Sequence, residues 1–216
     1  MTKGRGPESS KVAYGVIKRV IDVCASLVGL IVLSPLLLVV ACLIRVKLGR
    51  PVLFRQMRPG LNEQPFYLCK FRTMRDAVDS NGQQLPDRER MTPFGAVLRL
   101  TSIDELPSLF NVLRGDLTLV GPRPLLMRYL PHFSETERLR FKVKPGITGW
   151  AQVHGRNELT WARRLQHDVW YVEHRSLLLD LRILLLTCLA VFKRSGVVVD
   201  PGSRMKDLDE ERTQSA

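Results

Sequence analysis

The feature that most constrains this chain is an apolar run at residues 20–44 that contains a single charged residue, Asp22. In a helix, these 25 residues would rise about 1.5 Å each, which is enough to cross the ~30 Å hydrocarbon core of a bilayer. The run is too long for the apolar centre of a signal peptide, and no small-residue cleavage site follows it. We therefore expect the chain to enter a membrane.

Ser34 and Pro35 interrupt this run near its middle. Pro35 removes one helical hydrogen-bond donor, and the Ser34 hydroxyl can satisfy the carbonyl that is freed. Basic residues flank the run on both sides: Lys11, Lys18 and Arg19 before it, and Arg45, Lys47 and Arg50 after it. Because positive residues mark the cytoplasmic side, both ends can lie on one face of the membrane. A re-entrant helix–break–helix hairpin and a kinked spanning helix therefore both fit the residues.

The charge of the chain indicates an anionic partner. The formal net charge is +12 and the isoelectric point is about 10.1, which fits nucleic acid, acidic lipid or a phosphorylated substrate. No nucleic-acid-binding motif is present, so we expect no nucleic acid partner. The four cysteines form no C-x-x-C pair and the four histidines have no zinc-binding spacing, so we expect no disulfide or zinc site and a reducing compartment.

The remaining chain alternates short strand and helix signals. Residues 51–58 and 65–74, separated by a turn at residues 60–62, predict a β-hairpin. Helices are expected at residues 94–100, from the acidic motif to about residue 114, from Ser134 as part of a capping box, and from Thr160 to about residue 174. The second apolar stretch, residues 177–192, contains Asp180 and Arg182 and is therefore expected to be an interfacial or core helix.

Two adjacent carboxylates, Asp104 and Glu105, lie in the motif SIDELP at residues 102–107. The commoner structural explanation is a capping box, with Ser102 as N-cap and Glu105 three residues later. The functional explanation is a nucleophile, since a helix N-terminus stabilises anions and would keep Asp104 ionised at neutral pH. The motif alone leaves both explanations open.

Several basic residues stand at positions that could bind phosphate: Lys70, Arg72, Arg99, Arg123 and Arg156. Each alone is most simply a solvated surface charge, but Arg123 lies between two prolines that fix its backbone, as phosphate recognition favours. Asp168 shares a helical face with apolar residues and needs a partner. The structural candidate for that partner is Arg164, four residues earlier, and the functional one is a metal ion or an active-site arginine; the residues favour neither explanation.

Five segments now stand in order: the basic-flanked Ser-Pro run, KFRTM at 70–74, TSIDELP at 101–107, LVGPRP at 119–124 and KPGITGWAQV at 144–153. Together they closely resemble the bacterial sugar transferases, the monotopic polyprenol-phosphate phosphoglycosyl transferases, over about residues 11–200. The chain is similar to the small stand-alone form of that family. One departure is His154, where the family commonly has Asn, and it puts the contacts expected around Arg156 in doubt.

The resemblance implies a two-step transfer of a sugar 1-phosphate from a UDP-sugar to a polyprenol phosphate, most simply undecaprenyl phosphate, with release of UMP. Asp104 would carry a covalent phosphosugar, and Glu105 would assist with Mg²⁺, so that both form the metal site. Phosphate groups or other parts of the substrates would be bound by Lys70, Arg72, Arg99, Arg123, Arg156 and Asp168. The product would start a bacterial polysaccharide, O-antigen or protein glycan.

The resemblance also implies a fold and a location. The expected class is α+β: a mostly helical monotopic membrane protein with a re-entrant hairpin broken at Ser34 and Pro35, a small β-hairpin and interfacial amphipathic helices. The expected parts are a flexible N-terminus (1–10), the membrane hairpin (11–50), a cytosolic catalytic domain at the bacterial inner membrane (51–200) and a tail (201–216). A membrane-tethered nucleic-acid-binding protein and an inactive scaffold are the alternatives. The sequence does not indicate the sugar, the pathway or the oligomeric state.

Overall fold

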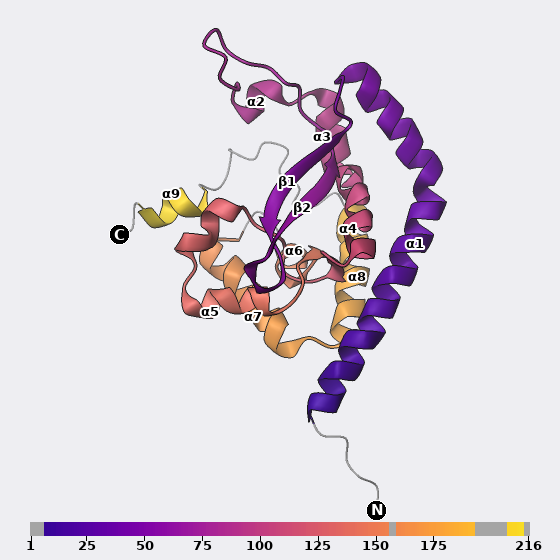
Figure 1. Cartoon of the computed structure of the whole chain (residues 1–216), viewed down its shortest axis with the longest axis vertical. Helices are drawn as coiled ribbons and strands as arrows, with labels where there is room; N and C mark the ends of the chain where they lie inside the picture. The colour runs from indigo at the N-terminus through magenta and orange to yellow at the C-terminus, as the bar shows by residue number, and fades with distance from the viewer. Residues whose placement is uncertain (1–6, 156–158, 193–206, 214–216) are drawn as a thin grey trace, which may run out of the picture.

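The computed structural model describes residues 7–155, 159–192 and 207–213, and it confirms a mostly helical α+β chain (Figure 1). The helices are α1 (Pro7–Lys47), α2 (Asp87–Arg90), α3 (Pro93–Leu100), α4 (Leu109–Arg114), α5 (Glu135–Arg138), α6 (Trp150–Val153), α7 (Trp161–His174), α8 (Leu177–Phe192) and α9 (Leu208–Thr213). The strands are β1 (Leu53–Pro59), β2 (Pro65–Phe71), β3 (Thr118–Val120) and β4 (Gly146–Thr148). Short 3₁₀-helices are η1 (Leu61–Glu63), η2 (Ile103–Ser108), η3 (Met127–His132) and η4 (Leu139–Lys142).

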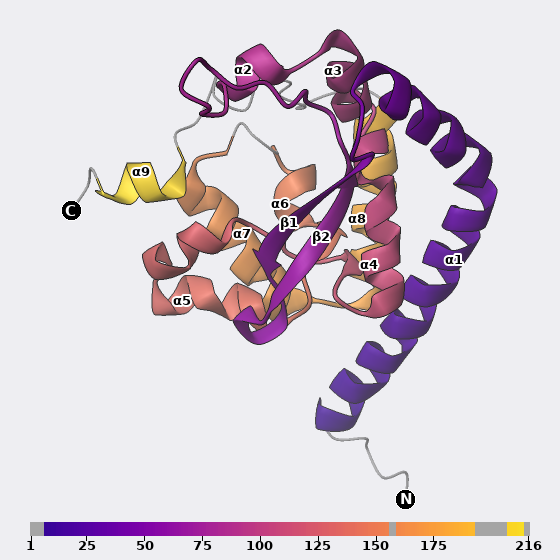
Figure 2. The same ribbon diagram turned by 45° about the horizontal axis from the view of Figure 1, so that its top comes forward.

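Helix α1 passes along one side of the domain and bends over α3 at its C-terminal end (Figures 1 and 2). It is long and apolar enough to cross a membrane, and most of its apolar side chains are exposed. The helix is continuous through Pro35, so the expected break is not an interruption of the helix. The hydroxyl of Ser34 donates to the carbonyl of Ile31 at 2.7 Å, the acceptor that Pro35 leaves without its helical donor. The predicted role of Ser34 is thus confirmed.

Two polar side chains attach α1 to the domain. Arg19 donates to the carbonyl oxygens of Val112 and Leu113 at 2.6 and 2.8 Å, which lie in the last turn of α4, where carbonyls lack helical donors. Asp22 accepts from the Thr118 hydroxyl at 2.5 Å and from the backbone N–H of Leu119 at 3.1 Å. The one charge in the apolar run therefore fixes α1 to β3.

The predicted hairpin is present as the antiparallel pair of β1 and β2, with Leu53 opposite Phe71. Two polar side chains join β2 to η2 and α4. The Asn111 amide accepts from the N–H of Cys69 at 3.0 Å and donates to the carbonyl of Tyr67 at 2.8 Å, and the Ser108 hydroxyl donates to the carbonyl of Cys69 at 2.8 Å. These bonds hold η2 and α4 against β2, which sets the carboxylate motif opposite Lys70.

The parallel pair of β3 and β4 joins the glycine-containing motifs. The N–H of Gly121 donates to the carbonyl of Thr148 at 2.8 Å, and the N–H of Gly146 donates to the carbonyl of Pro122 at 3.0 Å. A Cβ atom on Gly146 would lie 2.1 Å from the Gly121 nitrogen, so only glycine allows this approach. The segment that carries Arg123 is therefore held by main-chain bonds on one side and by its prolines on the other.

The other predicted helices are present, with one difference at the C-terminus. Thr160 caps α7, Ser134 and Glu137 form the predicted capping box, and α8 covers the second apolar stretch. Residues 207–213, expected to belong to a tail, instead dock on the domain through α9, which buries Leu208 fully. At the other end, α1 already begins at Pro7, within the stretch expected to be flexible.

Candidate active site

The acidic motif forms the 3₁₀-turn η2, and the capping box considered for it is not formed. Ser102 has φ of 56° and makes no side-chain cap bond, so it cannot act as the N-cap of a regular helix. A non-glycine residue in this left-handed region is strained by about 1–3 kcal/mol, and such strain gathers at functional sites. The capping-box explanation of the motif is therefore wrong, and the functional explanation of Asp104 and Glu105 stays a prediction.

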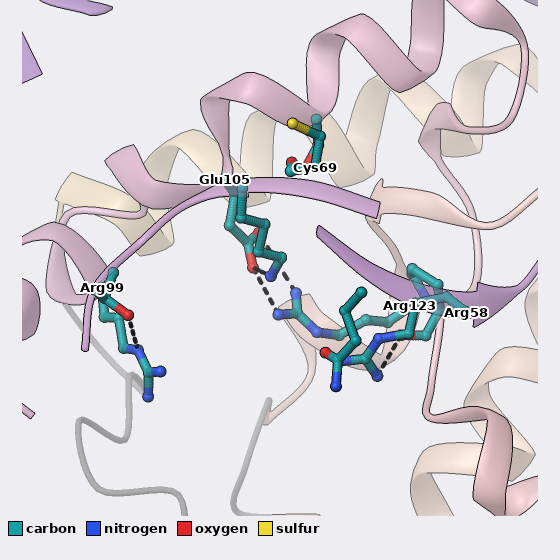
Figure 3. A network of polar contacts seen from close by, with 10 residues as sticks. Arg58, Cys69, Arg99, Glu105 and Arg123 are labelled. Carbon is teal, nitrogen blue, oxygen red and sulfur yellow. Dashed lines mark hydrogen bonds and ion pairs between the residues drawn. The ribbon is translucent and has the colours of Figure 1, made fainter. Parts of the chain in front are cut away.

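Glu105 holds two cations, and Figure 3 shows this cluster. Its Oε1 lies 2.6 Å from Nζ of Lys70 on β2 and 2.6 Å from Nη2 of Arg123. Burial alone would raise the pKa of the Glu105 carboxyl, but Arg123 and Lys70 outweigh it and hold the pKa well below its usual range. Glu105 is therefore ionised at every physiological pH and fixes the positions of both cations.

Asp104 has the opposite environment. The residue is 9% exposed, and within the described part of the chain its carboxylate makes no hydrogen bond or ion pair. Burial, and then the charge of Glu105, raise its pKa to about 6, against the opposing charges of Lys70, Arg123 and Arg99. At pH 7 about nine tenths of the carboxyl is ionised. Asp104 is thus mostly ionised at pH 7, as expected, but its pKa is higher than a position at a helix N-terminus would give.

A cavity of about 90 Å³ opens beside Glu105. Four cations line it: Arg58, Lys70, Arg123 and Arg164. Sequence reasoning missed Arg58, whose pKa is lowered to about 10 by burial and by the neighbouring Arg123. The register of the hairpin could have revealed it. Arg58 lies opposite Phe66, and Phe66 and Lys70, four residues apart on β2, lie on the same face of the sheet, so Arg58 and Lys70 share that face. Such a cavity can hold the phosphates of a substrate.

Not all the predicted substrate residues point into this cavity. Arg99 donates from Nε to the Thr73 hydroxyl at 3.1 Å and lies to one side of Glu105, while Arg123 and Arg58 lie to the other (Figure 3). Arg72 is 7% exposed and donates to the backbone carbonyls of Met74 and Arg50, so its guanidinium serves the fold. Arg156 lies outside the described residues.

Asp168 is buried and pairs with an arginine that the sequence did not single out. Nε and Nη2 of Arg140 lie 3.2 and 2.8 Å from Oδ2 of Asp168, and both residues are 2% exposed. Burial raises the pKa of the Asp168 carboxyl, and the charge of Arg140 opposes the rise. Nη2 of Arg140 also donates to the backbone carbonyl of Arg123 at 2.6 Å. Asp168 thus supports the active-site arginine through Arg140.

The two motif carboxylates are the candidates for Mg²⁺. No group of three His, Cys, Asp or Glu residues suited to a metal occurs among the described residues. Mg²⁺ is commonly held by one or two carboxylates together with substrate phosphates, so a larger protein cluster is not required. Asp104 has a carboxylate without a protein partner in the described chain, and Oε2 of Glu105 has only a long 3.5 Å contact to Arg123. The residues therefore fit a substrate-bound Mg²⁺.

Comparison with known proteins assigns the family. The model of the bacterial sugar transferase family matches residues 13–194. The chain belongs to the bacterial sugar transferase family. This sugar transferase is 51% identical over 182 residues to the uncharacterised sugar transferase EpsL of Bacillus subtilis, covering 84% of the chain and 90% of the relative. The expectation of a transferase enzyme is confirmed.

Two further relatives of this sugar transferase carry more specific names. The UDP-glucose:undecaprenyl-phosphate glucose-1-phosphate transferase of Xanthomonas campestris is 42% identical over 190 residues, covering 82% of the chain but 39% of the relative. The exopolysaccharide production protein ExoY of Rhizobium meliloti is 36% identical over 199 residues, covering 84% of the chain and 88% of the relative. The sugar transferase therefore matches short relatives nearly end to end and part of a longer one.

Proposed function

We propose that this sugar transferase moves a sugar 1-phosphate from a UDP-sugar to undecaprenyl phosphate and releases UMP. The observation that carries the proposal is the buried Asp104 carboxylate beside Glu105, whose Oε1 holds Lys70 and Arg123 at 2.6 Å at the edge of a cation-lined cavity. Relatives named for transfer of glucose 1-phosphate or N-acetylgalactosamine phosphate to undecaprenyl phosphate support the same reaction class. The product starts a bacterial glycoconjugate.

In the first step, a carboxylate oxygen of Asp104 attacks the sugar-bearing phosphorus of the UDP-sugar. A bond forms between this oxygen and phosphorus, the bond from phosphorus to the bridging oxygen breaks, and UMP leaves with the electron pair. The phosphosugar stays on Asp104 as an acyl phosphate. Because the nucleophile attacks as an anion, the step needs no proton transfer from Asp104.

In the second step, a phosphate oxygen of undecaprenyl phosphate attacks the same phosphorus. The bond to Asp104 breaks, its carboxylate is restored, and a polyprenol-diphosphate sugar is formed with the bond between sugar and oxygen intact. The two steps use one site in turn, which gives ping-pong kinetics.

Both steps gather negative charge, and catalysis of phosphoryl transfer consists mainly of positioning and charge neutralisation. Lys70, Arg123 and Arg58 supply fixed positive charge at the cavity, and Glu105 keeps the first two in place. When bound with the donor diphosphate, Mg²⁺ held by Asp104 and Glu105 would neutralise charge on the phosphate oxygens.

The membrane arrangement belongs to the same proposal. The lipid substrate presents its phosphate at the membrane surface, so the catalytic carboxylate must lie at that depth. A re-entrant α1, bent near its C-terminal end and basic at both flanks, would hold the domain on the cytoplasmic face of the inner membrane. The exposed apolar side chains of α1 support burial of this helix in lipid.

The decisive experiment looks for the covalent intermediate. The enzyme is mixed with a UDP-sugar labelled in the sugar-bearing phosphate, without lipid acceptor, quenched in acid and analysed by peptide mass spectrometry. We expect a phosphosugar on Asp104 and one equivalent of UMP, no adduct in Asp104→Asn, and slower formation with a weaker Mg²⁺ response in Glu105→Gln. Turnover by Asp104→Asn would contradict the assignment, and turnover without any trapped adduct would indicate direct transfer in a ternary complex. A panel of UDP-sugars scored by UMP release with undecaprenyl phosphate present identifies the sugar.

A further inference from the structure

A second cavity lies apart from the catalytic residues, between the N-terminal half of α1, β3 and the end of α7. Its volume is about 280 Å³, and none of its lining residues lines the catalytic cavity. Apolar parts of its wall come from Leu61, Val120 and Val143. Neither step of the proposed reaction uses this cavity.

Four cations line this second cavity, and two of them have no hydrogen-bond or ion-pair partner among the described residues. Lys18 is paired with Asp180 at 2.6 Å, and Arg19 donates to neutral carbonyl oxygens. Lys144 and Arg175 are half-buried, and neither makes a hydrogen bond or ion pair with any residue that the structure describes.

The charges on these walls do not cancel. Asp22 is the one carboxylate among the described lining residues, and its oxygens are already used by Thr118 and Leu119. With Asp180 included as the partner of Lys18, the cations still exceed the carboxylates by two. Lys144 and Arg19 also converge, since a Cβ atom on Gly115 would lie 3.4 Å from Nζ of Lys144 and 3.6 Å from Nη2 of Arg19. Such a cluster of like charges attracts an anion.

The surface of α1 beside the cavity indicates what kind of anion. Lys18 and Arg19 stand at the start of the apolar run, and Val16, Val20 and Ile21 on the same part of the helix are exposed. Exposed apolar side chains on a helix are unfavourable in water and favourable against acyl chains. The ligand that satisfies both the charge and this surface is therefore amphiphilic.

We propose that the cavity binds the phosphate of an anionic glycerophospholipid, whose acyl chains lie along α1. Basic pockets beside membrane helices bind such headgroups because they combine charge neutralisation with a fixed depth at the interface. One phosphate would contact Lys144 and Arg175, the two cations without partners among the described residues. The bound lipid stabilises the attachment of α1 to the domain.

The test measures lipid binding to the purified full chain in neutral detergent by native mass spectrometry. The ligands are dioleoylphosphatidylglycerol, dioleoylphosphatidylcholine and sn-glycerol 3-phosphate, so the arms separate an anionic lipid, a neutral lipid and the free headgroup. We expect one tightly held phosphatidylglycerol per chain and about thirtyfold weaker binding in Lys144→Gln/Arg175→Gln. The matched control is Lys142→Gln/Arg163→Gln, which removes the same charge at exposed residues and should bind as the wild type does.

Three results would overturn the proposal. The first is equal phosphatidylglycerol binding by Lys144→Gln/Arg175→Gln and the wild type. The second is binding of phosphatidylcholine as tight as that of phosphatidylglycerol, which would leave no role for the charge. The third is binding of glycerol 3-phosphate as tight as that of the lipid, which would assign the cavity to a free phosphate. Circular dichroism on the same samples shows that both variants are folded, and no sugar donor is needed.

Discussion

Asp104 and Glu105 are neighbours in sequence, yet their surroundings push their pKa values in opposite directions. Burial and the adjacent charge raise the pKa of Asp104 to about 6, whereas Arg123 and Lys70 outweigh burial at Glu105 and lower its pKa. Paired groups with diverging pKa values mark a division of chemical roles. Glu105 is suited to remain an anion that organises cations, and Asp104 to gain and lose a bond to phosphorus.

The pKa of Asp104 predicts the pH dependence of the first step. In the proposed first step only the Asp104 carboxylate attacks phosphorus, so the rate of UMP release without acceptor should fall below pH 6 and reach about a tenth of its plateau at pH 5. In Glu105→Gln the second cause of the raised pKa is gone, and Lys70 and Arg123 are left to act on Asp104 alone. The acid limb of the normalised profile should therefore move to lower pH, as measured by quench-flow.

Glu63→Gln is the matched control for this profile. Glu63 is also paired with an arginine, since Oε1 lies 2.5 Å from Nη1 of Arg138, but it does not line the catalytic cavity. The acid limb of the Glu63→Gln rate profile should stay near pH 6. A limb that stays near pH 6 in Glu105→Gln as well would show that the pH dependence does not report on Asp104.

Arg140→Lys tests the support of Arg123. The buried Arg140 guanidinium bridges the Asp168 carboxylate and the carbonyl of Arg123. A lysine keeps the positive charge but cannot donate to both acceptors in this geometry. Loss of one charge-assisted hydrogen bond, worth about 1.5 kcal/mol, should lower kcat/KM for the UDP-sugar about tenfold. The lysine leaves Asp168 with a cationic partner, which avoids the 3–5 kcal/mol cost of breaking a buried pair.

Arg138→Lys provides the matched control for Arg140→Lys. Arg138 likewise bridges a carboxylate and a carbonyl, those of Glu63 and Leu130, but away from the cavity. The Arg138→Lys variant should keep the wild-type kcat/KM for the UDP-sugar. If both variants lose kcat/KM equally, and the loss follows the fall in their thermal midpoints, Arg140 acts on stability alone.

The residues that sequence reasoning found are those that carry a local signal. Asp104 and Glu105 are adjacent, and Arg123 is marked by its flanking prolines. Arg140 carries no such signal, because its partner Asp168 is 28 positions away and only the packing of η4 against α7 brings them together. Motifs therefore reveal the residues nearest the chemistry, while the groups that position them depend on tertiary contacts.

At the level of elements, the effect of Pro35 on α1 could be predicted only in part. The sequence predicted that Ser34 would satisfy a carbonyl freed by Pro35, and the bond to Ile31 confirms it. The continuous helix was not predicted, because one missing donor can be replaced locally while the neighbouring turns keep their bonds. Likewise, docking of α9 could not be predicted from a polar segment, since it depends on tertiary contacts: the burial of Leu208 and the ion pair of Arg212 with Glu137.

A double-mutant cycle at Ser34 and Pro35 tests this replacement. Ser34→Ala should destabilise the protein by about 1–2 kcal/mol, because the Ile31 carbonyl then has no donor in an apolar environment. Pro35→Ala restores a backbone N–H to the same carbonyl, so Ser34→Ala should cost much less in that background. Thermal midpoints in detergent give the comparison. Equal costs of Ser34→Ala in both backgrounds would show that the hydroxyl does not replace the missing donor.

At the scale of the whole molecule, α1 and the active site share one rigid connection. Asp22 ties the helix to β3, and β3 leads directly into the proline-flanked Arg123. Arg19 ties the same helix to the end of α4, whose preceding turn carries Asp104. In the proposed membrane arrangement, the depth of α1 would therefore set the height of the proposed catalytic residues, and the lipid proposed at Lys144 and Arg175 would act on the same connection.

This connection makes the membrane topology of α1 the final prediction. A re-entrant helix places both of its ends on the cytoplasmic face. Lys11→Cys and Lys47→Cys should therefore react with an impermeant maleimide in inverted vesicles and not in intact cells. Each is made in a background with the native cysteines replaced by alanine: Cys24, Cys42, Cys69 and Cys188. Lys142→Cys, at an exposed position of the domain, reports the cytoplasmic side in the same experiment. Labelling of Lys11→Cys from the opposite side to Lys47→Cys would show a spanning helix. The bend of α1 would then be a kink within the span, and the ties through Asp22 and Arg19 alone would have to hold the active site at the height of the lipid phosphate.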